Sequence, residues 1–474
     1  MRLPPDLGGP VKELNIFSSR GCYSPPEESK IQPMKPVTII GGGLAGSEAA
    51  WQLLSRGVPV RLFEMKPRVY SPAHRSPFLA ELVCSNSFRS ENLSTAVGLL
   101  KQEMKLMNSL IMEAALASRV PAGKALAVDR ELFAHRVEKS LVENELCTIE
   151  RYEVKNVPGS LPLIIATGPL TSDDLARDLL RLTGSEAMFF YDAISPVVEA
   201  DSIDHDVVFR ASRYEKGEGD YLNCPLNKRQ YEVFHRAVLD GREIELKDFE
   251  DRKCFEGCLP IEVLARRGID TLRYGPMKPV GLIDPRTGFQ PWAVVQLRKE
   301  NLQGSLYNMV GFQTKLARPE QERIFRMIPG LDKARFARFG TIHRNTFLDS
   351  PRLLDHHLEL KDCKGVFFAG QITGVEGYLE SAATGLLAGI NTAFLVKEGE
   401  LPEPPPSETA LGALINHVTN DFTADFQPSN INFGLFPTLE EKTRKKERGG
   451  HYARRALKAI EKWKKSVDPH VFRS

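Results

Sequence analysis

The sequence has almost no net charge, few cysteines and no long hydrophobic run. Its 63 Lys and Arg nearly balance its 61 Asp and Glu, for a formal charge of +2, so any affinity for nucleic acid must come from local patches. Seven cysteines without regular spacing exclude a disulfide scaffold and favour a reducing, cytoplasmic location. No apolar run approaches the roughly 18 residues that span a bilayer. We therefore expect no membrane association.

The length of 474 residues is sufficient for two or three domains. Residues 1–33 are rich in proline, glycine and serine and show no periodicity. We expect a disordered extension over this stretch, with Met34 as a candidate natural start.

Residues 37–64 have the pattern of a dinucleotide-binding βαβ unit. An apolar strand, Val37–Ile40, leads into glycines in G-x-G-x-x-G spacing. A helix is expected over 47–54, and a second strand, Val60–Phe63, ends in an acidic residue. Because strand, glycines, helix and acid occur in order, an ordinary glycine-rich turn is the weaker interpretation.

Each residue of this motif has a physical role in holding a dinucleotide. Gly41 permits the tight turn, Gly43 lets the backbone approach a pyrophosphate, and Gly46 lets the helix lie close to the strand. The carboxylate of Glu64 suits a ribose with free hydroxyls and would repel a 2′-phosphate. The motif therefore favours FAD or NAD over NADP.

Two later segments are typical of the remainder of a two-dinucleotide flavoprotein domain. An apolar strand at 163–166 leads to Ala-Thr-Gly168, and another at 366–369 ends at Gly370. A helix of small residues over 377–393 would allow close approach to a flavin, and its N-terminus would stabilise negative charge on the reduced ring.

The chain between these segments has mixed, short strand-like and turn patterns, so we predict an inserted domain. The fold class is α/β, a two-dinucleotide-type FAD-binding Rossmann domain split in sequence by an inserted α+β domain. Within the first part, the apolar periodicity predicts one long helix over 97–117. The expected division is a FAD-binding part over 34–205, an insertion over 206–345, a second FAD-binding part over 346–435, and a basic helical tail over 436–474.

Cys84 lies in a polar loop shortly after the first βαβ unit. A lone cysteine is more often a small buried hydrophobe than a reactive group. Here the neighbours Ser85, Asn86, Ser87 and Arg89 make a polar and cationic setting that favours a thiolate. Cys84 is therefore a candidate for chemistry.

Cys254 and Cys258 form a second candidate thiol site. Their spacing lacks a second pair or a clustered histidine, so structural zinc is disfavoured and no metal is expected. Cys258 follows Gly257 and shortly precedes Pro260, a rigid turn that could present a thiol to a substrate. Two buried structural thiols remain the alternative.

Three further features are candidate contacts for a ligand or for RNA. Trp292 and the triplet His343, Arg344 and Asn345 could contact a planar ligand, although such an aromatic is more often core. Residues 442–465 carry eleven Lys or Arg and two Glu, so a helix there could bind phosphates. A merely solvated helix is nearly as good an interpretation.

Together, several segments closely resemble the folate- and FAD-dependent tRNA (uracil-5-)-methyltransferases, the TrmFO family. The likeness runs from about Met34 to the C-terminus. It rests on VTIIGGGLAGSEAAWQLLSRG, FEMKP, ELVCSNSFRS, FEGCLPIE, GPMKPVGL, FAGQITGVEGYLESAATGLLAGINTA and FQPSNINFGLFP.

The resemblance implies transfer of a one-carbon unit from 5,10-methylenetetrahydrofolate to C5 of the T-loop uridine, position 54, of tRNA. FAD reduced by NADH or NADPH would complete the methyl group. Uracil C5 is a poor nucleophile until a thiolate adds to C6, and the family's two functional cysteines match Cys84 and Cys258. We expect Cys258 to attack C6 and Cys84 to assist proton transfer, with the reverse assignment open. Glu376 and residues 343–345 match regions that line the flavin and folate pocket.

Three alternatives remain at this point. The larger FAD protein that installs a carboxymethylaminomethyl group on wobble uridine shares the FFAGQITG segment, but FEGCLPIE belongs to the methyltransferase pattern. A flavin- and RNA-binding module without turnover would not need Cys258. A generic flavin oxidoreductase would oxidise NAD(P)H regardless of tRNA or folate.

Overall fold

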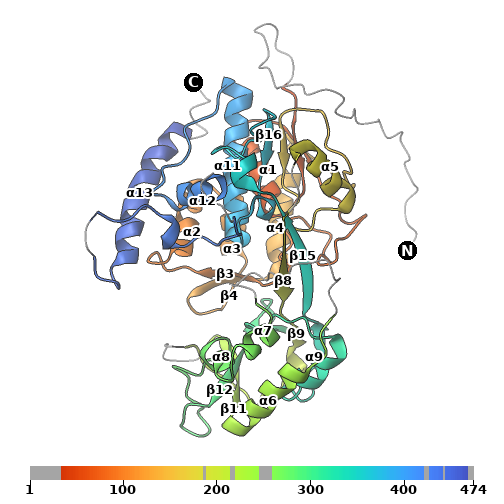
Figure 1. Cartoon of the computed structure of the whole chain (residues 1–474), viewed down its shortest axis with the longest axis vertical. Helices are drawn as coiled ribbons and strands as arrows, with labels where there is room; N and C mark the ends of the chain where they lie inside the picture. The colour runs from red at the N-terminus through yellow and green to blue at the C-terminus, as the bar shows by residue number, and fades with distance from the viewer. Residues whose placement is uncertain are drawn as a thin grey trace.

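The computed structural model describes residues 34–184, 188–213, 219–244, 259–420, 426–440 and 443–467. The expected extension over 1–33 and the pair Cys254 and Cys258 lie outside these residues. Figure 1 shows two lobes. The first lobe is formed by the described residues up to 184 and beyond 347, and the second by those between 197 and 338.

The first lobe is built on a five-stranded parallel sheet in the order β16-β7-β1-β2-β6. Strand β1 lies in the middle, so the glycine-rich turn that follows it opens at the carboxyl edge of the sheet. The sheet confirms the expected α/β fold with a parallel Rossmann-type sheet. Its strands are β1 (Val37–Ile40), β2 (Val60–Phe63), β6 (Cys147–Glu150), β7 (Leu163–Ile165) and β16 (Val366–Phe368).

Helices α1 (Leu44–Ser55) and α11 (Tyr378–Glu398) are in backbone contact in this lobe. A Cβ on Gly385 would lie 2.1 Å from the carbonyl oxygen of Ala45, and one on Gly389 would lie 2.6 Å from that of Ala49. These two small residues of α11 therefore serve contact with α1, whereas the sequence suggested approach to a flavin. By length and composition α11 could cross a membrane, but 83% of its most apolar stretch is buried inside the protein.

The helix expected over 97–117 is two helices, α2 (Ala96–Leu106) and α3 (Leu110–Ala117). The prediction of one helix was wrong because Asn108 adopts a left-handed conformation, with φ +58°. Ser109 then starts α3 by accepting a hydrogen bond from the amide of Met112, the usual action of an N-terminal cap.

The second lobe contains a six-stranded antiparallel sheet in the order β10-β11-β12-β13-β9-β14. Its apolar face packs with the helices of the lobe into a separate core. The strands are β9 (Val197–Glu199), β10 (Phe209–Arg210), β11 (Tyr221–Leu226), β12 (Ala293–Lys299), β13 (Leu306–Met309) and β14 (Phe336–Arg338). The helices are α6 (Lys228–Asp240), α7 (Ile261–Arg266), α8 (Thr271–Tyr274) and α9 (Arg318–Phe325).

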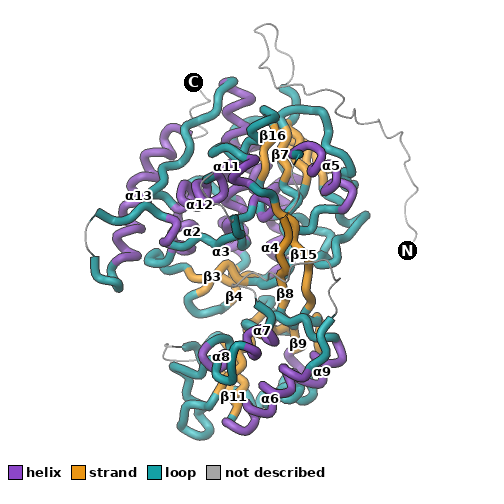
Figure 2. Tube along the Cα trace, viewed as in Figure 1, coloured by secondary structure: helices purple, strands orange, loops and turns teal. Residues whose placement is uncertain are grey.

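An antiparallel ribbon of β8 (Met188–Ile194) and β15 (Thr341–Phe347) runs between the two lobes (Figure 2). A small sheet in the order β3-β5-β4 completes the lower side of the first lobe. Its strands are β3 (Ser87–Ser90), β4 (Arg119–Val120) and β5 (Ala125–Val128). The other helices of the first lobe are α4 (Arg130–Val142), α5 (Asp173–Thr183), α10 (Ser350–Leu353), α12 (Ala410–Thr419) and α13 (Arg448–Val467).

Candidate active site

The turn after β1 forms a cradle with one open position. Gly41 has φ +104°, and a Cβ there would lie 2.4 Å from the carbonyl oxygen of Ala166. A Cβ on Gly46 would lie 1.8 Å from the oxygen of Gly41, so both glycines are needed for β1, α1 and β7 to approach. A Cβ on Gly43 would meet no other residue within 4 Å. Gly43 therefore faces open space at the start of α1, where no side chain caps the helix and an anion is favoured.

Glu64 is held in place by the backbone at the end of β2. Its Oε2 accepts a hydrogen bond from the amide of Gly42 at 3.0 Å, and its Oε1 accepts one from the amide of Lys66 at 2.9 Å. The carboxylate is buried and lines the pocket above the glycine turn. This position beside the cradle suits contact with a ribose.

The cradle opens into a first pocket of about 1090 Å³, its open mouth included. Most of the glycines and the acid predicted from the sequence line it: Gly41, Gly43, Glu64, Gly168 and Gly370. Gly46 lies behind them as a packing residue. Gly370 has φ +86°, and its amide donates to Oγ1 of Thr384 in α11, which ties the second glycine segment to this helix.

A second pocket adjoins the first and is lined by both lobes. Val83, Gln371 and Tyr378 line both pockets, so the two share a wall. Of the residues predicted from the sequence, Cys84, Asn345 and Glu376 line the second pocket.

The remaining predicted residues do not all meet there. His343 and Arg344 lie on β15, opposite Asp192 and Tyr191 of β8. Trp292 lines neither pocket; its ring is covered by the guanidinium of Arg273, 4.0 Å from the ring centre. Cys258 lies outside the described residues.

Cys84 is fixed by Tyr378, the first residue of α11. The Tyr378 hydroxyl lies 2.9 Å from Sγ and accepts hydrogen bonds from the amides of Cys84, at 2.8 Å, and Ser85, at 3.0 Å. Burial, followed by the charge of Cys84, raises the pKa of Tyr378 well above its usual value. The phenol therefore stays neutral and keeps a proton beside the sulfur.

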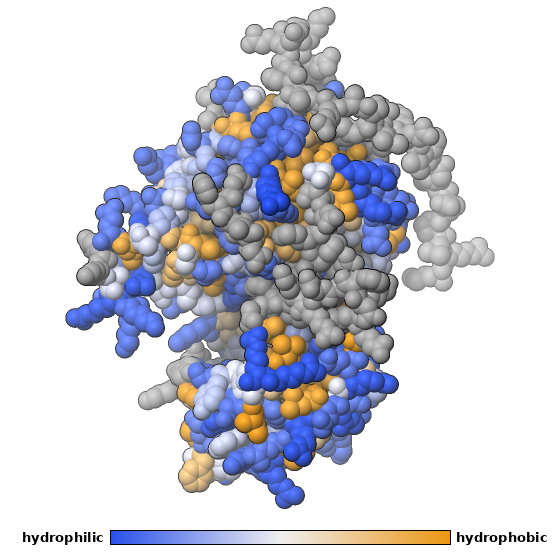
Figure 3. Space-filling model, in the orientation of Figure 1, coloured by the Kyte–Doolittle hydropathy of each residue, from blue (hydrophilic) through white to orange (hydrophobic). Residues whose placement is uncertain are grey.

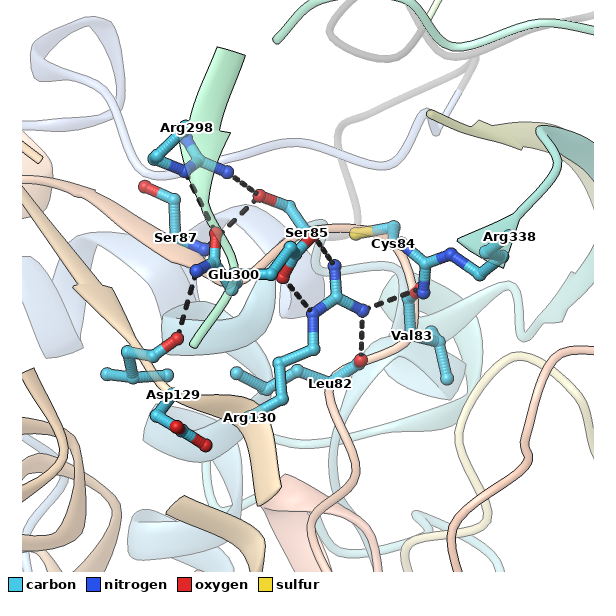
Figure 4. A network of polar contacts seen from close by, with 12 residues as sticks. Leu82, Val83, Cys84, Ser85, Ser87, Asp129, Arg130, Arg298, Glu300 and Arg338 are labelled. Atoms are coloured by element: carbon cyan, nitrogen blue, oxygen red, sulfur yellow. Dashed lines mark hydrogen bonds and ion pairs between the residues drawn. The ribbon is translucent and has the colours of Figure 1, made fainter. Parts of the chain in front are cut away.

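Three guanidinium groups surround the segment that carries Cys84 (Figure 4). Arg130 makes two hydrogen bonds to Glu300, at 2.7 and 2.9 Å, and one to the carbonyl of Leu82 at 2.7 Å. Arg338 donates to the carbonyl of Val83 at 2.9 Å.

The third guanidinium, Arg298, comes from β12 and reaches across the lobe boundary. It donates to Oγ of Ser85 at 2.8 Å and to Oδ1 of Asn86 at 2.9 Å. The side-chain Nδ2 of Asn86 in turn donates to the carbonyls of Val128 and Lys299, at 2.9 and 2.8 Å. The two lobes are therefore joined through the polar groups that follow Cys84.

The charges of this cluster do not cancel. Against three guanidinium groups the cluster has one carboxylate, Glu300, whose pKa is lowered by Arg130 although burial opposes its charge. Burial, and then repulsion from Arg130, lowers the pKa of Arg338 to about 10. The excess of positive charge favours a negative charge on sulfur or on a ligand beside it.

Sequence reasoning missed Tyr378 and the cluster of Arg130, Arg298, Glu300 and Arg338. A signal existed for two of them, because Gln296, Arg298 and Glu300 occupy alternate positions in the second half of β12 and directly after it. Charged residues in that pattern indicate a strand face that meets another polar surface.

Comparisons with known proteins show the family of the chain. The family model described as glucose inhibited division protein A, GIDA, matches residues 36–400. A relative from Syntrophus aciditrophicus (strain SB) is 58% identical over 428 residues, which cover 90% of this chain and 97% of the relative. One from Geobacter sulfurreducens is 59% identical over 432 residues, 91% of this chain and 99% of the relative. Both are named methylenetetrahydrofolate–tRNA-(uracil-5-)-methyltransferase TrmFO.

Solved structures show the same fold. GidA from Aquifex aeolicus in its form II crystal has a TM-score of 0.64 at 18% identity, covering 90% of this chain and 73% of that chain. The form I crystal gives 0.63 at 17% identity, covering 92% and 77%. At this identity the likeness concerns the fold alone.

Proposed function

The chain belongs to the GIDA family and to its TrmFO methyltransferases, and we propose that it methylates C5 of a uridine in tRNA, with 5,10-methylenetetrahydrofolate as carbon donor and FAD as cofactor. Identity of 58–59% over 90–91% of the chain supports this activity. At the level of residues, the observation that carries it is the position of Cys84. The Cys84 thiol lines the second pocket, and the preceding residue in the sequence, Val83, lines both pockets.

The first pocket has the features that FAD requires. The open position at Gly43, the uncapped start of α1 and the anchored carboxylate of Glu64 fit a pyrophosphate followed by a ribose. When bound, FAD supplies hydride-transfer chemistry. Gly168 and Gly370 would approach the cofactor with their backbone, and Tyr378 would separate its pocket from the thiol.

Cysteine addition explains why thiols are needed beside a one-carbon donor. A thiolate that adds to C6 of uracil pushes electron density to C5, which can then attack the donor. We assign the attack to Cys258 and proton transfer to Cys84. The neutral phenol of Tyr378 supports the second assignment, because its oxygen accepts a hydrogen bond from the Cys84 thiol and so places a second exchangeable proton next to the sulfur.

The second pocket would receive the folate and the uracil. Asn345 and Glu376 are buried polar groups on its wall, and Glu376 is oriented by a hydrogen bond from Gln371. Asn345 and Glu376 are candidates for contacts with the pterin ring. So are His343 and Arg344, which lie on the same strand as Asn345.

The proposed RNA target is the T-loop uridine at position 54. This base is stacked within the folded tRNA, so it must leave its stack to reach the pocket. Helix α13 supports a role in holding the RNA backbone. Exposed basic residues line its outward side: Arg448, Arg454, Lys458, Lys462 and Lys465. In Figure 3 hydrophilic side chains gather along the edge of the molecule where α13 lies.

The reductant and the location follow from this chemistry. NADH or NADPH would regenerate the reduced cofactor, as the TrmFO resemblance implies. A cytoplasmic location would supply tRNA, reduced folate and a reducing environment for the thiols.

The test is methylation of unmodified tRNA with labelled methylenetetrahydrofolate and NADH, with S-adenosylmethionine as the rival donor. Label at C5 of a T-loop uridine that requires folate supports the proposal. Cys84→Ala and Cys258→Ala should lose transfer, while Cys147→Ala on the edge strand β6 serves as a matched thiol control. Flavin absorbance should be retained in all three variants.

The same assay separates the alternatives. A carboxymethylaminomethyl product at the wobble uridine would identify the larger FAD protein's activity. NADH oxidation that ignores tRNA and folate would indicate a generic oxidoreductase. A flavin- and tRNA-binding module would bind both and transfer no label.

A further inference from the structure

The face of the second-lobe sheet that meets the first lobe is buried but polar. Gln296, Arg298 and Glu300 occupy alternate positions of β12 or its end, and all three are buried. Val295 and Leu297, which point to the opposite face of the strand, belong to the apolar core of the lobe. Because a buried polar group is costly without a hydrogen bond, each of these side chains should have a partner.

The three side chains on β12 do have structural partners. Gln296 donates to Oδ1 of Asn223 at 3.0 Å. Glu300 is engaged by Arg130, and Arg298 by the segment that follows Cys84.

Asn308 on β13 differs from them. It stands directly opposite Arg298 in the antiparallel pairing of β12 with β13, and it is only 3% exposed. Its Nδ2 has no hydrogen-bond partner among the residues that the structure describes. Asn308 lines the second pocket, which Cys84 also lines. A buried donor with no partner in a ligand pocket is suited to an acceptor that the substrate brings.

We propose that Asn308 donates a hydrogen bond to the O4 carbonyl oxygen of the target uracil. The inference rests on the proposed methyltransferase function. As the sulfur–C6 bond forms, the C5=C6 electron pair moves toward C4 and negative charge accumulates on O4. A neutral amide donor stabilises this charge without giving up a proton, and the guanidinium of Arg298 across the strand adds a positive field.

The later steps reverse this shift of electrons. When C5 takes up the one-carbon unit, the electron pair returns to restore the C4 carbonyl. The proton on C5 then leaves to a base while the bond between the one-carbon unit and the nitrogen of its carrier breaks, which leaves an exocyclic methylene on C5. A hydride, which FAD in its reduced form would supply, adds to this methylene and returns the negative charge to O4. The C5=C6 bond then forms again as the C6–S pair returns to sulfur as thiolate. Asn308 therefore acts on the first and last of these steps, when charge is on O4.

The experiment measures formation of the covalent adduct between the protein and tRNA containing 5-fluorouridine, together with the methylation rate. Asn308→Ala removes the donor and should slow both by roughly 100-fold, with flavin content and Tm unchanged. Asn308→Ser keeps a small donor and should recover part of the loss. Asn301→Asp, in the loop between β12 and β13 and outside the second pocket, should stay within about twofold of the wild type.

Two results would overturn the inference. One is adduct formation by Asn308→Ala within threefold of the wild type. The other is loss of flavin in proportion to the loss of adduct, because that outcome assigns the amide a structural role. A wild-type chain that transfers no methyl group refutes the proposed function and Asn308 with it. Transfer by both wild type and Asn308→Ala refutes only the role of Asn308.

Discussion

The hydroxyl of Tyr378 lies 2.9 Å from Sγ of Cys84, although 294 positions separate the two residues in sequence. Tyr378 begins α11, and α11 is in backbone contact with α1, the helix that starts at the glycine cradle. The thiol is therefore positioned by the same helix pair that shapes the cofactor pocket. Substitutions at the contact between Tyr378 and Cys84 should therefore lower the rate of methyl transfer more than they lower FAD binding.

Tyr378→Phe tests this relationship. The change removes the oxygen that accepts from the amides of Cys84 and Ser85 and takes away the proton beside sulfur. We expect the methylation rate to fall by roughly 10- to 100-fold, with flavin retained. Tyr274→Phe, whose side chain is 71% exposed in the second lobe, is the matched control. Wild-type turnover by Tyr378→Phe would show that the phenol plays no part.

Two glycine substitutions distinguish a loss of FAD affinity from a loss of folding stability. Gly46→Ala forces a Cβ against the oxygen of Gly41, so we expect a loss of stability of a few kcal/mol, seen as a lower Tm without added FAD. Gly43→Ala meets no other residue, so the apoprotein should keep its Tm while FAD affinity falls at least tenfold. Equal FAD affinity in wild type and Gly43→Ala would mean that this position does not face the cofactor.

Lys101 gives stability a pH dependence. It is 2% exposed, and its Nζ donates to the carbonyl of Ser90 at 2.7 Å. Burial, and then repulsion from Arg89, lowers its pKa from 10.5 to about 7. Between about pH 7 and 10.5 the unfolded chain therefore binds more protons than the folded chain, so this residue makes stability rise with pH in that window.

We expect Lys101→Met to flatten that rise, with Tm measured from pH 6.5 to 10. Below pH 7 the variant should be more stable than the wild type, by a few kcal/mol at most, because it removes the cost of a buried charge. Lys333→Met, exposed in the second lobe, should leave the profile unchanged. A parallel pH profile for Lys101→Met and wild type would contradict the assignment.

The basic side of α13 should contribute to tRNA affinity through phosphates. Lys458→Gln combined with Lys462→Gln should weaken binding and reduce the slope of log K against log salt by up to about 0.7–0.9 for each phosphate that is no longer neutralised. Arg229→Gln combined with Arg236→Gln, exposed on α6, is the charge-matched control. Arg455 is a poor choice, since it donates to the carbonyls of Pro437 and Thr438. An unchanged salt slope for the α13 pair would remove this helix from the RNA surface.

The parts of the fold that were predictable are those in which neighbouring residues decide the structure. Strands β1 and β2 have the expected bounds, because a short strand-forming run before a glycine turn or an acid admits few alternatives. The break at Asn108 was missed because one left-handed residue barely disturbs an apolar helical periodicity. Within the helix of small residues, the contact of Gly385 and Gly389 with α1 was not predicted, because a small residue in sequence does not reveal what approaches it.

The site was predictable only where a motif carried it. Cys84 and the glycines of the cradle follow from local patterns. Arg298 and Tyr378 reach Cys84 from strands and helices more than 200 positions away, and that proximity arises from sheet pairing and helix contact. The alternating polar residues of β12 indicate a buried polar face, but a single sequence does not indicate which distant residues that face meets.

The contact between α1 and α11 has a consequence for how the protein is made. Strand β16 and helix α11 complete the first lobe, yet they are synthesised after the whole second lobe. Since domains fold as units during synthesis at about 5–20 residues per second, the second lobe is complete roughly 1 to 6 seconds before the last strand of the first lobe is made. The cofactor pocket is therefore completed only after the second lobe has been synthesised.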